Sequence, residues 1–178
     1  MIPAYITLAR PYATAIFNLA IKDNNIINWK QQLQICTKIA STELIQQQCL
    51  NGVNSIKLIE IFISIGKDQI NQETKNLISI MTQNKRLNLF PNILNYFLKL
   101  IDDYYQIIHL EIISAYKLEL IFLNSIHEKL KKYFSKKIIF KHTIDSSIIG
   151  GLVIKNNDQT IDYSISTQLK ILSNIIKN

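Results

Sequence analysis

The chain has 178 residues, of which 48% are hydrophobic and 19% are charged, and its formal net charge is +7. This length and apolar content allow one core or two small ones, and a count of four glycines argues against disorder and against many tight turns. No apolar run approaches the roughly 18 to 20 residues that cross a bilayer, and we expect no secretory signal. Only Arg10 and Arg86 among the twenty basic residues are arginine, so we expect each to hold a fixed geometry.

The first hundred residues have the spacing of consecutive helices. Apolar residues from Ala9 to Ala20 recur at steps of three and four, which predicts a helix with one buried stripe. Pro11 is expected in or near the first turn, where its missing N–H costs little. The same spacing predicts further helices over residues 26–40, 42–48, 56–65, 74–83 and 88–105.

Capping residues mark where several of these helices begin. Ser41-Thr42 suits the start of the third helix, and Asn71 or Thr74 suits that of the fifth. Asn88 is expected to cap the sixth helix, since Pro91 then lies in a first turn. Short polar breaks between six helices predict a compact bundle.

Beyond Gln106 the pattern becomes mixed. Strands are predicted over residues 107–115, 136–144 and 148–155, and helices over 117–134 and 165–176. Gly150-Gly151 is interpreted as close backbone packing or a bulge, and Ser164 as the cap of the last helix. The sequence therefore predicts a mainly α fold, with an N-terminal six-helix bundle over residues 1–105 and a small α+β C-terminal domain over residues 106–178.

The sequence offers no arrangement of reactive side chains that supports an enzyme. The three histidines are scattered, and no glycine-rich phosphate loop is present. Asp102 and Asp103 are adjacent, but helical neighbours point about 100° apart and cannot share a proton. Cys36 and Cys49 are expected to be unpaired buried thiols in a reducing compartment. We expect no catalytic residue, no cofactor and no metal.

The remaining signal is a surface for partners. Ala9, Ala13 and Ala20 lie on the inner stripe of the first helix, and Ala15 lies on another side. Small side chains allow a second helix to approach closely, either within the bundle or from another protein. A groove between the first and fifth helices would suit an amphipathic partner helix.

Several segments, in the correct order along the chain, resemble the delta subunit of bacterial F-type ATP synthase, whose mitochondrial counterpart is the oligomycin-sensitivity-conferring protein. They are Ala9-Arg10-Pro11-Tyr12-Ala13-Thr14-Ala15-Ile16-Phe17, Trp29, Asn76-Leu77-Ile78, Asn84-Lys85-Arg86-Leu87, Ile144-Asp145-Ser146-Ser147-Ile148-Ile149-Gly150-Gly151 and Ile161-Asp162-Tyr163-Ser164. The resemblance covers essentially the whole chain.

The resemblance implies a non-catalytic stator subunit, peripheral to the cytoplasmic face of the bacterial inner membrane. In that family the N-terminal bundle grips the N-terminal helices of the α subunits, and the C-terminal domain holds the b subunits of the stalk. Proton flow thereby stays coupled to ATP synthesis. The α-binding residues implied here are Tyr12, Ala15, Trp29, Asn76, Ser79 and Gln83. The residues assigned to structure are Arg10, Arg86, Gly150, Gly151, Asp162 and Ser164, the two arginines through contacts such as bonds to helix-end carbonyls.

The chain departs from the family pattern near its end. Tyr163 stands before Ser164 where the family has glycine, and Ser166-Thr167-Gln168 stands where a basic residue is expected. Because tyrosine enters a left-handed turn less easily than glycine, we expect this turn and part of the stalk contact to differ.

The alternative is a basic RNA- or DNA-binding helical protein, which the net charge of +7 and the eight tyrosines favour. Such binding requires a concentrated basic stripe with exposed aromatic rings. The lysines are instead spread along the chain, and the tyrosines mostly have helical core spacing. We therefore expect no nucleic-acid partner.

Overall fold

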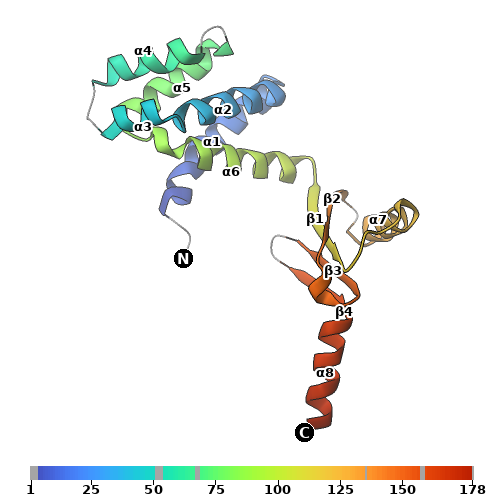
Figure 1. Cartoon of the computed structure of the whole chain (residues 1–178). Coiled ribbons are helices and arrows are strands. Elements are labelled where there is room, and N and C mark those ends of the chain that lie inside the picture. The colour runs from blue at the N-terminus through green and yellow to red at the C-terminus, as the bar shows by residue number, and fades with distance from the viewer. Residues whose placement is uncertain (1–3, 51–53, 67–68, 135, 157–158, 178) are drawn as a thin grey trace. The chain divides into compact units, whose positions relative to one another are not determined.

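Helices form the first hundred residues, and a small sheet with two further helices forms the rest (Figure 1). The structure is a computed structural model that describes residues 4–50, 54–66, 69–134, 136–156 and 159–177. It divides into an N-terminal unit, Met1–Ile101, and a C-terminal unit, Asp102–Asn178. The prediction of a mainly helical fold with a small sheet is confirmed. Within the described ranges, no helix is both long and apolar enough to cross a membrane.

The N-terminal unit is built from helices joined by short connections. These are α1 (Ala4–Lys22), α2 (Ile26–Ala40), α3 (Glu43–Leu50), α4 (Ser55–Gly66), α5 (Gln72–Gln83) and α6 (Phe90–Tyr104), with a 3-10 turn, η2 (Leu87–Leu89), before α6. Pro11 lies inside α1, so its predicted place in the first turn is wrong. The helix begins earlier because helical apolar spacing extends back to Tyr5 and Leu8, and it continues past the hydrogen bond that proline cannot donate.

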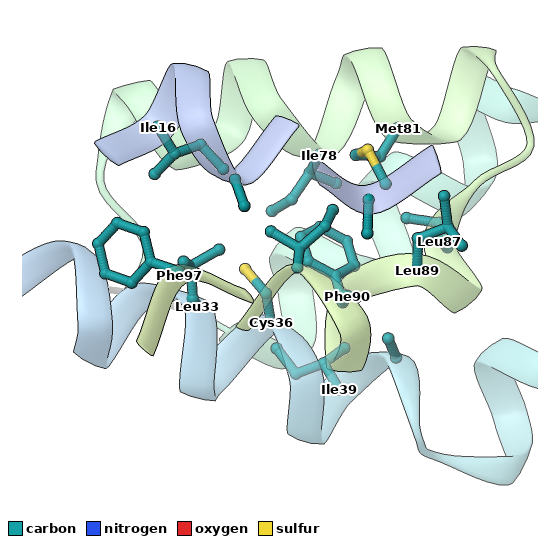
Figure 2. Close-up of a cluster of buried hydrophobic side chains, with 14 of the residues drawn as sticks. Ile16, Leu33, Cys36, Ile39, Ile78, Met81, Leu87, Leu89, Phe90 and Phe97 are labelled. Atoms are coloured by element: carbon teal, nitrogen blue, oxygen red, sulfur yellow. The ribbon is translucent and has the colours of Figure 1, made fainter. Parts of the chain in front are cut away.

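One hydrophobic cluster holds this unit together (Figure 2). Figure 2 shows its side chains from α1, α2, α5 and α6 gathered in one interior, among them Ile16, Leu33, Cys36, Ile78 and Phe97. The alanines of the inner stripe of α1 are fully buried, which lets the neighbouring helices come close. Burial raises the pKa of the Cys36 thiol to about 12, so this cysteine stays protonated and unreactive. The side chain of Cys49 lies outside the described part.

The helix starts confirm some caps and correct others. Asn71 caps α5, since its Oδ1 accepts the Thr74 N–H at 2.8 Å. Among the described residues, the Thr42 hydroxyl makes one hydrogen bond, as the donor to the Lys38 carbonyl oxygen at 3.3 Å, and it accepts no N–H of α3. Asn88 is not the cap of α6 either. It lies within η2, where the chain tightens so that Leu87 and Leu89 are both buried.

The C-terminal unit is a two-layer α/β module. Its elements are β1 (Ile107–Ser114), α7 (Leu120–Phe134), β2 (Lys137–Ile144), the 3-10 turn η3 (Ser146–Ile148), β3 (Gly151–Lys155), β4 (Thr160–Ser164) and α8 (Ile165–Lys177). The sheet order is β2-β1-β3-β4, with β1 parallel to β2 and the other pairs antiparallel. Helix α7 makes the crossover that parallel strands need, and its Ile126 and Leu130 pack on one sheet face.

The predicted strand over residues 148–155 is shorter than expected. It begins at Gly151 because η3 occupies residues 146–148 and Ile149 has a φ of 64°. Gly151 has a φ of 84°, and a Cβ at this position would clash with the Tyr163 carbonyl oxygen. Gly151 therefore permits both the left-handed backbone and the close pairing of β3 with β4.

We predict that Gly151→Ala destabilises the protein by about 2 kcal/mol, because alanine adds left-handed strain and a backbone clash. Urea denaturation followed by circular dichroism measures this loss. Gly150→Ala is the matched control, since a Cβ there would meet only the flexible end of Ile165, at 2.8 Å. Equal losses in the two variants would contradict the explanation.

Candidate partner-binding surfaces

Helix α1 carries a second apolar stripe outside the core. Tyr5, Leu8, Tyr12, Ala15 and Leu19 follow steps of three and four, so they share one side of the helix. Tyr5 is 64% exposed, Leu8 is 41% and Leu19 is 50% exposed, while Tyr12 is half-buried and Ala15 is exposed. A soluble helix usually turns such a stripe inward, so this one is suited to receive another helix.

Helix α5 carries an exposed row of mixed character. Asn76, Ile80 and Gln83 are exposed at steps of four and three. Ser79 is only half-buried, but its hydroxyl donates to the Lys75 carbonyl oxygen at 2.9 Å. Among the predicted residues of α5, Asn76 and Gln83 are therefore the more available to a partner. The sequence reasoning missed Ile80, as it missed Tyr5, Leu8 and Leu19, although the step of three and four could have revealed them.

The two arginines contact tyrosine rings within the N-terminal unit. Arg86 Nη1 donates to the Tyr12 hydroxyl at 2.9 Å, and its Cζ lies 5.9 Å from the centre of that ring. Arg10 Cζ lies 5.6 Å from the centre of the Tyr96 ring. The two arginines were expected to bond carbonyl groups at helix ends, and the structure gives them tyrosine partners instead. The Arg86 contact joins α1 to the segment that follows α5.

Trp29 was predicted to lie at the partner surface, but it is only 2% exposed. Its Nε1 has no hydrogen-bond partner among the described residues, which leaves a buried donor at a cost of about 1–3 kcal/mol. A partner cannot touch this ring without rearranging α2. Trp29 can therefore report binding only indirectly.

Helix α8 of the C-terminal unit exposes an apolar row. Ile165, Leu169, Leu172 and Ile176 follow steps of four, three and four and are 44% to 83% exposed. The opposite side of the helix carries Lys170 and Asn174 together with Ile171, which is 55% exposed. The end of the Ile165 side chain lies against Gly150, whereas Leu169, Leu172 and Ile176 are each more than half exposed, as is typical of a helix that packs on a partner.

Asp162 and Ser164 anchor the start of α8. Asp162 accepts hydrogen bonds from the Ser164 N–H and the Thr167 hydroxyl, both at 2.8 Å, and Ser164 Oγ accepts the Thr167 N–H at 3.2 Å. These bonds, first from Ser164 and then from Thr167, hold the pKa of Asp162 below its ordinary value. Tyr163 is extended in β4 opposite Leu152, so the expected problem of a left-handed tyrosine does not arise.

One pair resembles catalytic machinery but cannot act as such. Ser114 Oγ lies 2.7 Å from His142 Nε2, and it also donates to the Tyr116 carbonyl oxygen at 2.5 Å. A hydroxyl has one proton, so His142 must donate and cannot activate Ser114 as a base would. Ser114 is also 1% exposed. Among the described residues, no group of three His, Cys, Asp or Glu side chains could hold a metal ion.

Exposed apolar rows on α1 and α8, together with no arrangement of catalytic groups among the described residues, are the features of an interaction protein. Residues 8–176 match the family described as ATP synthase delta (OSCP) subunit, and the chain belongs to that family. It is 37% identical to ATP synthase subunit delta of Buchnera aphidicola subsp. Schizaphis graminum, over 96% of each chain. It is 31% identical to ATP synthase subunit delta 1 of Photobacterium profundum, over 97% of each chain.

A solved structure shares the fold. A chain of the Toxoplasma gondii mitochondrial ATP synthase hexamer superposes with a TM-score of 0.61 at 17% identity, covering 96% of this chain and 98% of that chain. Family membership makes this protein a non-catalytic peripheral-stalk subunit of an F-type ATP synthase. It therefore belongs to the membrane-peripheral part of that complex. The predicted stator role is confirmed, and nothing favours the nucleic-acid-binding alternative.

We predict that acid weakens the anchor of α8 through Asp162. Because its folded pKa is lowered from 3.8, the carboxylate stabilises the fold above that value, and the contribution is lost as pH falls through the folded pKa. Thr167→Ala removes one donor and should raise the Asp162 pKa toward 3.8, as measured by NMR titration of the carboxyl carbon. An unchanged titration midpoint would show that these bonds do not set the pKa.

Proposed function

We propose that α1 to α6 form a six-helix bundle that binds the N-terminal helices of the α subunits of the catalytic head. The C-terminal unit binds the b subunits of the peripheral stalk. The protein then stands at the cytoplasmic face of the bacterial inner membrane and resists the torque of the rotor. This resistance keeps proton flow coupled to ATP synthesis.

The exposed stripe of α1 is the observation that carries the first part of this proposal. Its large side chains, Tyr5, Leu8 and Leu19, remain between 41% and 64% exposed. Fully burying a large apolar side chain contributes about 1.5–3 kcal/mol, so three of them on one side supply a substantial docking energy. Ala15 lies between Tyr12 and Leu19 and leaves room for the backbone of an approaching helix. An amphipathic helix with its own apolar row is the natural occupant.

Arg86 positions this surface. Its planar guanidinium both donates to the Tyr12 hydroxyl and stands near the ring, two contacts that an ammonium group cannot make together with fixed geometry. Tyr12 is therefore held in one orientation between the core and the outer stripe. A partner helix meets a preformed ring, which lowers the ordering cost of binding.

The exposed row of α8 supports the second part. The helix has 13 residues, or about 20 Å, and Ile165, Leu169, Leu172 and Ile176 share one side of it. A helix this short gains little by pairing with an identical helix, because stable two-stranded coiled coils usually extend over three or more heptads. A long stalk helix that continues past α8 onto the rest of the unit is the better match.

We predict that Ala15→Arg weakens binding of a synthetic helix from the N-terminus of a cognate α subunit by about tenfold or more, because it fills the gap in the stripe with a charged chain. Fluorescence anisotropy of the labelled peptide measures the affinity. Thr14→Arg is the matched control: Thr14 is equally exposed, but lies about 100° around the helix. Equal weakening in both variants, or none in either, would exclude the outer stripe as the docking site.

We predict that Leu169→Glu with Leu172→Glu weakens binding to the soluble part of the cognate b subunits by about tenfold or more, since carboxylates replace the apolar row. Lys170→Glu with Asn174→Glu on the opposite side should have a much smaller effect. Both double variants are compared by pull-down and calorimetry after their melting temperatures have been matched. Full binding by the leucine variant would refute the role of α8.

A further inference from the structure

The sheet of the C-terminal unit has a second face that α7 does not cover. A hollow of about 520 Å³ opens there, and its lining includes His109 and Glu111 of β1, Ile139 and Lys141 of β2, and Lys155 of β3. In a strand, alternate residues share a face, so these side chains stand opposite the set that packs on α7. The hollow shares no residue with α8 or with the exposed rows of α1 and α5.

The strand register gives the hollow an apolar centre and a cationic rim. Ile139 pairs with His109 and is 46% exposed, although it lies in the middle of β2. Glu111 pairs with Lys141 on one side and with Lys155 on the other. Lys137 is two residues before Ile139 and therefore lies on the same face.

The lysines on this face are not neutralised at close range. The carboxylate of Glu111 accepts a hydrogen bond from the Thr143 hydroxyl at 2.9 Å. Within the described residues, no carboxylate oxygen lies within 4.0 Å of the Lys141 or Lys155 amine. His109 pairs with Asp102 at 3.1 Å, and Lys155 acts on Asp145 only at longer range, lowering its pKa after the hydrogen bonds from Ser147. On β1 to β3, three lysines thus share this face with one carboxylate, that of Glu111, which is already hydrogen-bonded. Asp162 of β4 lies on the same face, and it accepts hydrogen bonds from Ser164 and Thr167.

We propose that this hollow binds an acidic segment of a protein partner, with an apolar side chain of that segment on Ile139 and its carboxylates beside Lys141 and Lys155. The charge of the rim is complementary to such a segment, and complementarity of this kind guides association and fixes register. An exposed isoleucine at the centre favours a peptide over a simple anion, because an anion leaves the apolar surface uncovered. Lysines also act as separate point charges here, without the arginine fork or the row of backbone N–H groups typical of phosphate sites.

The test uses the full chain, labelled with nitrogen-15, and a blocked hexapeptide of Glu and Asp with one central Leu. We expect saturable NMR shift changes centred on Ile139, Lys141 and Lys155, and weaker binding when salt is raised. Lys141→Glu with Lys155→Glu should lower the affinity about tenfold or more. Lys117→Glu with Lys131→Glu changes the net charge equally at exposed sites outside the hollow and should have little effect. If the charge reversal prevents folding, Lys141→Gln with Lys155→Gln replaces it, and this variant should also bind the peptide more weakly than the natural protein does.

The apolar part of the proposal is tested separately. Replacing the Leu of the peptide by Ser should weaken binding to the natural protein, and Ile139→Ser should remove the difference between the two peptides. If both peptides bind equally and inorganic triphosphate displaces them completely, the hollow is an anion site and the proposal is wrong. It is also wrong if the control lysine pair weakens binding as much as Lys141 and Lys155 do, because the attraction is then unspecific. Neither result bears on the surfaces proposed for the α and b subunits.

Discussion

The contact between Arg86 and Tyr12 is the constraint on which the N-terminal surface depends. Tyr12 lies at the boundary between two stripes of α1, the buried alanine stripe and the exposed stripe of larger side chains. The alanines bring α1 close to the core, and closeness brings the Tyr12 hydroxyl within 2.9 Å of Arg86 Nη1. One guanidinium then fixes the ring and ties α1 to the end of α5. The retention of arginine in so lysine-rich a chain follows from this double contact, since lysine offers neither the planar fork nor the ring stacking.

The two proposed docking helices differ in how much order a partner must supply. Helix α1 is packed against the core from Ala9 to Ala20, so the outer stripe over these turns is ordered before binding. Helix α8 is anchored at its start by Asp162 and Ser164, and its later residues are exposed on all sides. Short helices with little packing are marginal in water, so a partner of α8 must offset an ordering cost that a partner of α1 does not meet. The acid-sensitive bonds of Asp162 therefore bear directly on how well α8 is presented.

The spacing of apolar residues predicted most elements because a helical stripe such as Ala9 to Ala20 depends on the local sequence alone. The caps Asn71 and Ser164 could be predicted for the same reason. Such spacing failed where distant packing decides the outcome. Nothing near Asn88 indicates that Leu87 and Leu89 will both be buried and force a 3-10 turn. For the site, the resemblance led to Tyr12 and Ala15, whereas Trp29 proved to be core. The tyrosine partners of Arg10 and Arg86 lie 86 and 74 positions away in sequence, beyond the reach of spacing rules.

The departure from the family pattern at Tyr163 leaves no strained backbone at that residue. Tyr163 is extended in β4, and the residues of this region with a positive φ are Ile149 and Gly151. Gly151 adopts its conformation without cost, but a β-branched residue such as Ile149 is strained there. Ile149 and Tyr163 are each 64% exposed, and the Gly150 carbonyl oxygen between the glycines accepts the Ile165 N–H at 3.0 Å. The turn thus bonds the first residue of α8, which connects the end of the sheet to the start of the proposed stalk-binding helix.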